Sequence, residues 1–397
     1  MNAPLTERKY APALALITTL FFLWALGVNL NDVLIPHLKK AFRLTDLQSS
    51  LIQSAFFGGY FLAAFPAGRL MERIGYKRGI LIGLALCATG ALLFIPAATI
   101  LVYGFFLFAL FVMACGQSFL EVAANPYVTI LGPPESAERR LNLAQSFNSV
   151  GAVVTPFIGA AFILTTTQSG SDEAATVRLP YLAIAAIFVI VAGIIYFTHL
   201  PEVVATQRTH ASIASAWRFP RLRQGVLAQF FYVGAQVGVA SFVIRFAEHV
   251  RPGTPDPVAA HYLQLHLIGF MIGRFAGSGM MKFVAPAKLL AIFAAAAFAC
   301  GAVAVFASGM FAIGAVVAIG AFHSIMFPTI FALGIKGLGD ATKLGSSLMV
   351  MAIVGGAALP AAMGYISDHS TIQRALLVPL FCYLYILNFA VRGSSVP

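Results

Sequence analysis

The sequence predicts an all-α membrane protein with twelve transmembrane helices in two pseudo-symmetric six-helix bundles. Three observations support this prediction. Hydrophobic residues make up 60% of the 397 residues and charged residues only 10%, against roughly a quarter in ordinary soluble domains. Twelve apolar runs are long enough to cross a bilayer, and proline and glycine recur at similar separations in the two halves of the chain.

The apolar runs define the expected helices. They cover residues 11–37, 48–69, 79–98, 101–131, 141–166, 179–199, 222–246, 259–281, 287–307, 310–334, 342–366 and 371–391. They lack the short alternating segments of membrane β-barrels, so we expect helices to span the bilayer. The first run follows Arg8 and Lys9, but it is longer than a signal core and shows no small-residue cleavage site, so we expect it to remain as the first helix.

Basic residues indicate the orientation of these helices. If the N-terminus is cytoplasmic, most of the 25 Lys and Arg residues fall in cytoplasmic segments, which include 68–79 and 201–224. The positive-inside rule then places both termini in the cytoplasm. The net charge of +11 therefore reflects membrane topology and does not indicate a nucleic-acid partner.

A polar stretch at 201–224 divides the chain into two halves. We expect an N-terminal six-helix bundle at 1–200, a cytoplasmic linker at 201–221 and a C-terminal six-helix bundle at 222–397. The repeated residues are Pro126, Gly151, Pro156 and Gly159 in the first half and Pro328, Gly355, Pro360 and Gly364 in the second. Such a repeat fits a binding site between the halves at mid-depth.

Two acidic residues lie well inside the predicted spans. Glu121 is about 15 Å from the end of its run near Leu131, and Asp32 is roughly 10 Å from the outer end of its run. An ionisable group at such depth costs at least ~2.5–3.5 kcal/mol, so a functional role is favoured over a merely structural hydrogen bond. Asp32 and Glu121 are therefore the candidate proton-coupling residues.

Amides accompany both acids at helical spacing. Gln117 and Asn125 share a face with Glu121, Asn29 shares a face with Asp32, and the next run carries Gln145 and Asn148. Carboxylates accept hydrogen bonds from hydroxyls, and amides both donate and accept them. This lining suits an uncharged, polyhydroxylated ligand such as a monosaccharide.

The second half carries different residues at the corresponding positions. Aligning Pro126 with Pro328 places His323 opposite Glu121, and the overlay of the 11–37 and 222–246 runs places Ser241 opposite Asp32. Gln229 and Gln236 share one helix face, so they and His323 are candidate lining residues. The alternative for His323 is a satisfied packing role, and Arg274 and Arg245 are interpreted as residues that snorkel near helix ends.

The segment "GRLMERIGYKRG", residues 68–79, resembles a loop motif of the major facilitator superfamily, with Glu72 where Asp is usual. The resemblance implies the major facilitator fold and a cytoplasmic gate that includes Gly68, Glu72, Arg73 and Gly75.

Further segments closely resemble the fucose–galactose–glucose:proton symporter family. They are "NLND" at 29–32, "LIQSAFFGGYF" at 51–61, "LEVAANPYVTILG" at 120–132, "RLNLAQSFNS" at 140–149 and "FPTIFALGIKGLG" at 327–339. The resemblance implies sugar uptake driven by a proton gradient in a bacterial inner membrane, with essential acids at Asp32 and Glu121. It also implies a sugar pocket lined by Asn29, Gln145 and Asn148.

Other functions remain open at this point. A sodium ion is the alternative to the proton, although only Asn29, Asn31 and Asp32 cluster as oxygen ligands near the outer acid. A proton-coupled exporter of amphipathic compounds is the second alternative, but the amide lining argues against it. The sequence has no HExxH or GxSxG motif, so we expect no enzyme, cofactor or metal site. The expected surroundings are a lipid bilayer, and the expected assembly is a monomer.

Overall fold

The computed structural model describes the backbone of residues 4–41, 46–100, 102–167, 178–201 and 213–394. Side chains are described in these ranges except at residues 27, 28, 30–50, 98, 156, 157, 159–178, 213, 393 and 394.

Helices make up nearly all of the described chain, as the apolar runs predict. The helices of the first half are α1 (Ala11–Ala41), α2 (Asp46–Ile100), α3 (Tyr103–Ile130), α4 (Ala137–Thr167) and α5 (Arg178–Phe197). Those that follow are α6 (Ile213–Trp217), α7 (Pro220–Val250), α8 (Asp256–Met280), α9 (Pro286–Phe306), α10 (Gly309–His323), α11 (Met326–Ile335), α12 (Thr342–Met351), α13 (Gly355–His369), α14 (Ile372–Ala375) and α15 (Leu377–Ser394).

Helix α2 contains two of the predicted spans. It has 55 residues, but Gly75 inside it has φ +80°, a left-handed conformation that glycine adopts without a steric penalty. The chain reverses there, so the helix forms a hairpin whose arms match the predicted runs 48–69 and 79–98. Gly75 is thus needed for the turn itself.

Two of the predicted spans are each divided next to a proline. The span 310–334 is divided into α10 and α11, and the span 371–391 into α14 and α15. Pro328 and Pro379 are each the third residue of the helix that follows the break. Proline is tolerated in the first turn of a helix, where its missing N–H breaks no hydrogen bond.

Nine helical segments of the described chain are long and apolar enough to cross a membrane. One of them, Leu51–Ala97, is 47 residues long and holds the two arms of α2. Counting both arms and adding α4 and α8, each of the twelve predicted spans is helical. The predicted all-α fold with twelve spans is therefore confirmed.

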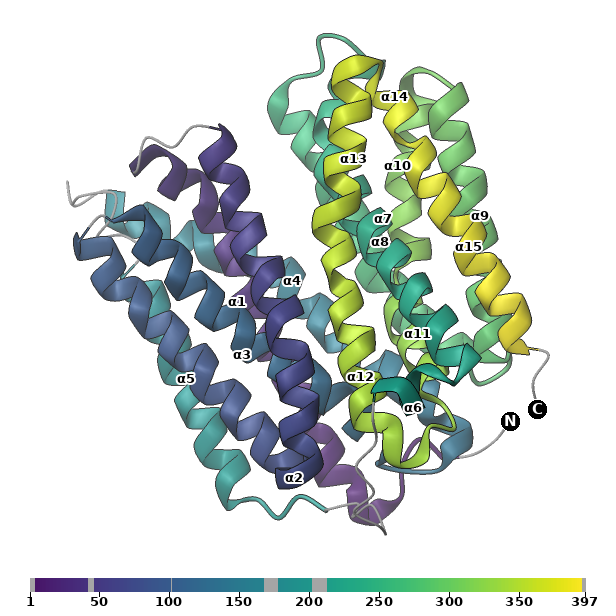
Figure 1. The fold of residues 1–397 in the computed structure, drawn as a ribbon. Helices are drawn as coiled ribbons and strands as arrows, with labels where there is room; N and C mark the ends of the chain where they lie inside the picture. The colour runs from purple at the N-terminus through teal and green to yellow at the C-terminus, as the bar shows by residue number, and fades with distance from the viewer. Residues whose placement is uncertain (1–3, 42–45, 101, 168–177, 202–212, 395–397) are drawn as a thin grey trace.

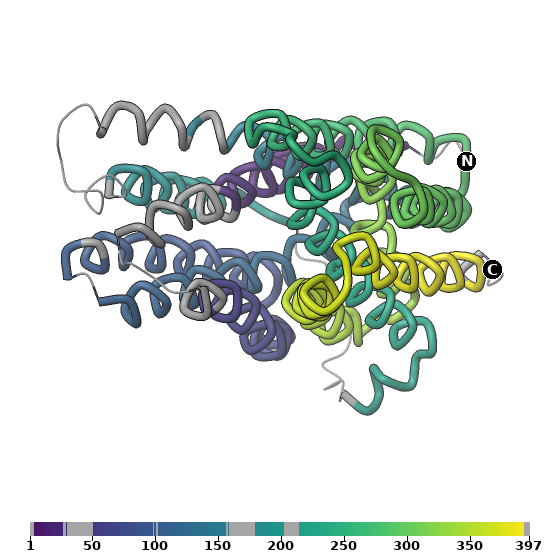
Figure 2. The backbone as a smooth tube through the Cα atoms, turned by 90° about the horizontal axis from the view of Figure 1, so that it is seen from above, coloured from purple at the N-terminus to yellow at the C-terminus, as the bar shows by residue number. Residues whose placement is uncertain are grey.

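The helices form two bundles that lie side by side (Figures 1 and 2). The first contains α1 to α5 and the second α7 to α15, and they meet where α2 packs on α12 and where α4 packs on α8 and α11. These contacts lie toward one end of the molecule, which carries the Gly75 turn and residues 131–136 and 336–341. We call it the closed end, and it is the lower end in Figure 1.

Helix α6 and the first residues of α7 lie within the predicted linker at 201–221. Residues 202–212 of the predicted linker lie outside the described residues, and α6 and the start of α7 follow them. The division at 1–200, 201–221 and 222–397 therefore stays a prediction.

Candidate functional site

Three of the predicted site residues form one hydrogen-bonded chain between α3 and α4. Asn125 Nδ2 donates to Glu121 Oε2 at 2.5 Å, and Gln145 Nε2 donates to Asn125 Oδ1 at 2.8 Å. Glu121 and Asn125 are one turn apart on α3, and Gln145 reaches them from α4. Asn125 is fully buried, and Glu121 is 8% exposed. We call these three residues the Glu121 chain.

Helix α3 extends this polar strip by one more turn. Gln117 lies one turn before Glu121, and its Oε1 accepts a hydrogen bond from the Tyr60 hydroxyl at 3.3 Å. The Nε2 of Gln117 is buried without a hydrogen-bond partner. The spacing of Gln117, Glu121 and Asn125 in the sequence predicts this shared face, whereas the contribution of Tyr60 from α2 depends on the packing of the two helices.

Asn29 lies on α1 and Asn148 contacts α1 from α4, so neither belongs to the Glu121 chain. Asn148 Nδ2 donates to the carbonyl oxygen of Phe21 at 3.2 Å, which ties α4 to α1. Asn29 Nδ2 donates to the carbonyl oxygen of Ala25 in its own helix at 2.7 Å. Both side chains are half-buried. The side chain of Asp32, the predicted outer acid, lies outside the described residues.

Arg274 corrects one prediction from the sequence. It was expected to snorkel from α8 toward a membrane surface, but it is only 4% exposed and points into the interface between the bundles. Its Nε donates to the carbonyl oxygen of Ser324 at 2.7 Å, and its Nη1 donates to the carbonyl oxygen of Gln145 at 2.7 Å. Nη1 also lies 3.3 Å from Gln145 Oε1.

A proline explains why Arg274 turns inward. In a continuous helix, the carbonyl of Ser324 would accept from the N–H of residue 328, but Pro328 has none. Arg274 supplies the missing donor. A guanidinium can donate up to five hydrogen bonds in a fixed geometry, so the same group also reaches Gln145 in the other bundle.

Two of the predicted site residues of the second half, Gln229 and His323, lie in its own core. His323 Nε2 is 2.7 Å from the Tyr383 hydroxyl, and the His323 carbonyl accepts from the Tyr232 hydroxyl at 3.0 Å. Gln229 is fully buried, and neither atom of its amide has a hydrogen-bond partner. Gln236 is half-buried. The structure records no hydrogen bond from these three described side chains to the Glu121 chain.

The predicted gate residues occupy the closed end. Gly68 approaches α12 so closely that an added Cβ would lie 1.7 Å from Ser347 Oγ. Glu72 Oε2 accepts from Arg69 Nη1 at 2.8 Å, and Glu72 Oε1 is buried without a partner. Arg73 is exposed, and Gly75 forms the turn of α2.

Two polar contacts add to the closure at this end. Lys336 Nζ forms an ion pair with Glu138 Oε1 at 2.9 Å, with Glu138 almost fully buried and Lys336 half-exposed. Asn142 Nδ2 donates to Thr329 Oγ1 at 3.0 Å. Neither contact could be predicted from the sequence, because each joins residues nearly two hundred positions apart.

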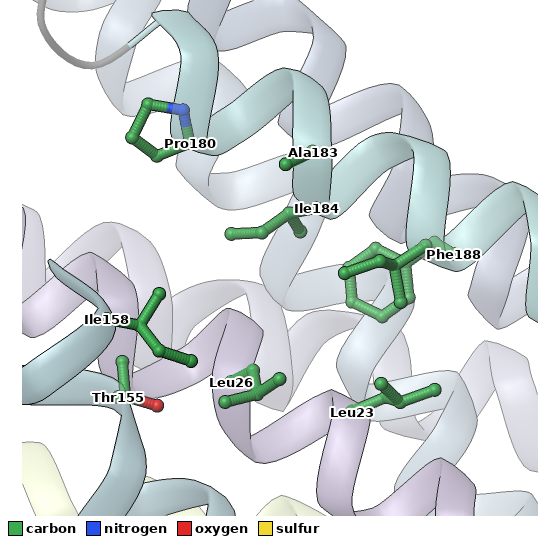
Figure 3. Close-up of a pocket in the computed structure, with 9 residues that line it drawn as sticks. Leu23, Leu26, Thr155, Ile158, Pro180, Ala183, Ile184 and Phe188 are labelled. Atoms are coloured by element: carbon green, nitrogen blue, oxygen red, sulfur yellow. The ribbon is translucent and has the colours of Figure 1, made fainter. Parts of the chain in front are cut away.

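A separate cavity of about 160 Å³ lies between α1, α4 and α5 (Figure 3). Its lining is almost entirely apolar and includes Leu26, Ile158 and Phe188. Its one hydroxyl side chain, Thr155, donates to the carbonyl of Gly151 in its own helix. None of the predicted sugar-site residues lines this cavity, and its chemistry does not suit a polyhydroxylated ligand.

Comparison with known sequences and structures agrees with this architecture. Residues 17–363 match the Major Facilitator Superfamily. The chain is 45% identical to a glucose/galactose transporter of Brucella abortus, over 98% of this chain and 96% of that protein. It is 43% identical to the L-fucose-proton symporter of Escherichia coli, over 97% of this chain and 93% of that protein.

Solved structures extend the similarity to three dimensions. The crystal structure of FucP, a Major Facilitator Superfamily transporter in the outward conformation, superposes with a TM-score of 0.91 at 42% sequence identity. The match covers 98% of this chain and 100% of that one. The chain therefore belongs to the Major Facilitator Superfamily, in the branch that includes these glucose/galactose and L-fucose transporters.

Proposed function

We propose that the chain is a secondary active transporter that imports a neutral monosaccharide together with a proton by alternating access. The observation that carries this proposal is the Glu121 chain, a buried carboxylate and two amides on the face of the first bundle near the second. Helix α3, which holds Glu121 and Asn125, packs on α11 and α12 of the second bundle. The names of the similar transporters support sugar as the substrate class.

The chemistry of the Glu121 chain fits a sugar edge. A carboxylate accepts hydrogen bonds from adjacent hydroxyls, and each amide can donate to one hydroxyl oxygen while accepting from another. Fucose, glucose, galactose and N-acetylhexosamines all offer such groups without a net charge. Further sugar contacts are proposed to form during the conformational change of the transporter. The residues are Asn29, Asn148, Gln229, Gln236 and His323.

Coupling is assigned to the two acids, Asp32 and Glu121. A proton on a carboxylate removes the cost of carrying its charge through a site closed on both sides. A sodium ion is the alternative coupling ion. The two differ experimentally, because only a sodium-coupled carrier needs sodium at fixed pH.

The closed end is proposed to face the cytoplasm, with both termini there, in the inner membrane of a bacterium. This orientation follows from the excess of basic residues in the segments at that end. In the described conformation, the site is then closed toward the cytoplasm. The transporter is proposed to act as a monomer. Its bundles are proposed to cover 1–200 and 222–397.

Counterflow in proteoliposomes tests the proposed function. Vesicles loaded with an unlabelled sugar should take up the same radiolabelled sugar transiently when hexoses, 6-deoxyhexoses and N-acetylhexosamines are screened in turn. At least one sugar should show this exchange, and protein-free vesicles should show none. Exchange of amphipathic cations without exchange of any sugar would instead support the exporter alternative.

A further inference from the structure

Arg274 is a buried cation at the interface between the bundles, and the proposed sugar chemistry does not use it. Within its own bundle it donates to the Ser324 carbonyl and lies over the Phe270 ring at 4.6 Å from its centroid. Across the interface it donates to the carbonyl oxygen of Gln145 and faces that residue's Oε1. It therefore joins α8 and the end of α10 in one bundle to α4 of the other.

Gln145 contacts both Arg274 and the rest of the Glu121 chain, which is the proposed sugar site. Its Nε2 donates to Asn125, which donates to Glu121. Its carbonyl and its Oε1 face Arg274. A ligand that draws the Gln145 side-chain amide toward itself therefore removes the contact between Gln145 Oε1 and Arg274.

Other hydrogen bonds between the bundles do not have this property. Examples among the described residues run from Asn142 to Thr329, from Lys336 to Glu138 and from Ser278 to Arg139. Each of them joins residues outside the Glu121 chain. Within this part of the molecule, the contact between Arg274 and Gln145 links closure to the site.

We propose that Arg274 is a positioning residue that holds the closed end shut while the sugar site is empty, by binding the Gln145 side of the Glu121 chain. The role assigned to the sugar rests on the proposed function. Opening of this end requires α4 to move away from α8, which separates Arg274 from Gln145. A buried guanidinium that loses its acceptors is costly, so the empty protein stays closed. Sugar hydroxyls that bind Gln145 and Asn125 weaken this contact and permit opening.

Distances between spin labels test this role in the full-length empty protein. Labels on cysteines that replace Glu135 and Lys282 report the separation of the bundles at the closed end, because both positions are exposed there. The four native cysteines are replaced by alanine. Arg274→Gln should raise the ratio of open to closed molecules roughly tenfold to a hundredfold, the effect of losing a charged hydrogen bond. Arg274→Lys should give a smaller increase.

Arg245→Gln is the matched control, because Arg245 is an exposed arginine on α7 of the same bundle. It should leave the distances unchanged. A closed distribution in empty Arg274→Gln, equal to that of the parent, would overturn the proposal.

A double variant shows whether the effect of one substitution could instead come from misfolding, because the second substitution should reverse it. Gln145→Glu in the Arg274→Lys background places a carboxylate opposite the lysine and should restore the closed population that Arg274→Lys loses. Failure of this pair to restore closure would also overturn the role. Because every measurement uses empty protein, the result does not depend on whether a sugar exchanges in the counterflow assay.

Discussion

Glu121 accepts a hydrogen bond from Asn125 and remains slightly exposed, so its carboxylate is the group on which sugar recognition is proposed to depend. Glu121→Gln should weaken sugar binding roughly 10- to 150-fold. The amide has one acceptor oxygen in place of two, and loss of a charged hydrogen bond costs about 1.5–3 kcal/mol. Isothermal titration of the purified variant with the sugar found by counterflow measures this change.

Glu248→Gln makes the same chemical change away from the Glu121 chain, on α7 near its end at Val250. Its sugar affinity should equal that of the parent. If Glu121→Gln also bound sugar with the parental affinity, Glu121 would have no part in recognition.

Asp32 is expected to serve coupling and not recognition. Asp32→Asn resembles the protonated acid, so sugar binding and exchange between equally loaded sides should survive while accumulation against a gradient is lost. Counterflow and pH-driven uptake, measured on the same proteoliposomes, separate these two activities. Active uptake by Asp32→Asn under an imposed pH gradient would remove Asp32 from the coupling mechanism.

Spacing along one helix made part of the site predictable. Gln117, Glu121 and Asn125 are four residues apart, so the sequence alone places them on one face of a helix. The inward position of Arg274 could not be predicted, because its acceptors come from α4 and from the break between α10 and α11. One of them is a carbonyl that Pro328 leaves without a helical donor. The contact between Asn142 and Thr329 could not be predicted either, because the two residues are far apart in the sequence.

At the level of elements, the close packing of α2 on α12 depends on Gly68. Gly68→Ala should weaken closure and slow transport, because the new Cβ would lie 1.7 Å from Ser347 Oγ and 3.0 Å from the Lys343 carbonyl oxygen. Overpacking of this kind costs about 1–3 kcal/mol. The rate of sugar counterflow, with the amount of inserted protein held equal, measures the effect.

Two further variants control this result. Gly58→Ala adds the same methyl group to α2 where nothing lies within 4 Å, so its rate should match that of the parent. Gly68→Ala combined with Ser347→Gly removes the nearest obstacle and should recover most of the lost rate. Equal rates for Gly68→Ala and Gly58→Ala would show that the close approach of α2 and α12 is not needed.

The apolar runs in the sequence predicted where the membrane-spanning helices lie. They did not predict where a span is divided into two helices. Pro66 and Pro126 remain inside continuous helices, whereas α11 begins two residues before Pro328. Which proline interrupts a span depends on whether neighbouring groups, such as Arg274, satisfy the freed carbonyl. This information lies in the packing of helices that are distant in sequence.

For the whole molecule, closure between the bundles depends in part on the ion pair between Glu138 and Lys336. Glu138→Lys should open the closed end a fewfold more often, because two lysines then face each other and such pairs contribute up to about 1 kcal/mol. Labelling of a cysteine at Asn142, which is buried at this end, by a maleimide reagent measures opening.

Exchange of the two charges, Glu138→Lys with Lys336→Glu, should return labelling to the parental rate. Lys288→Glu reverses an exposed lysine at the start of α9 and should have no effect. If the exchanged pair labelled as fast as Glu138→Lys alone, the ion pair would not contribute to closure.

The proposed function requires proton-driven sugar accumulation, which can be measured as uptake by proteoliposomes under an imposed gradient. Vesicles without sodium, alkaline inside and acidic outside, should concentrate the radiolabelled sugar above its external level. The accumulation should disappear when an ionophore collapses the pH gradient. Uptake that is indifferent to the pH gradient but requires a sodium gradient at fixed pH would contradict proton coupling.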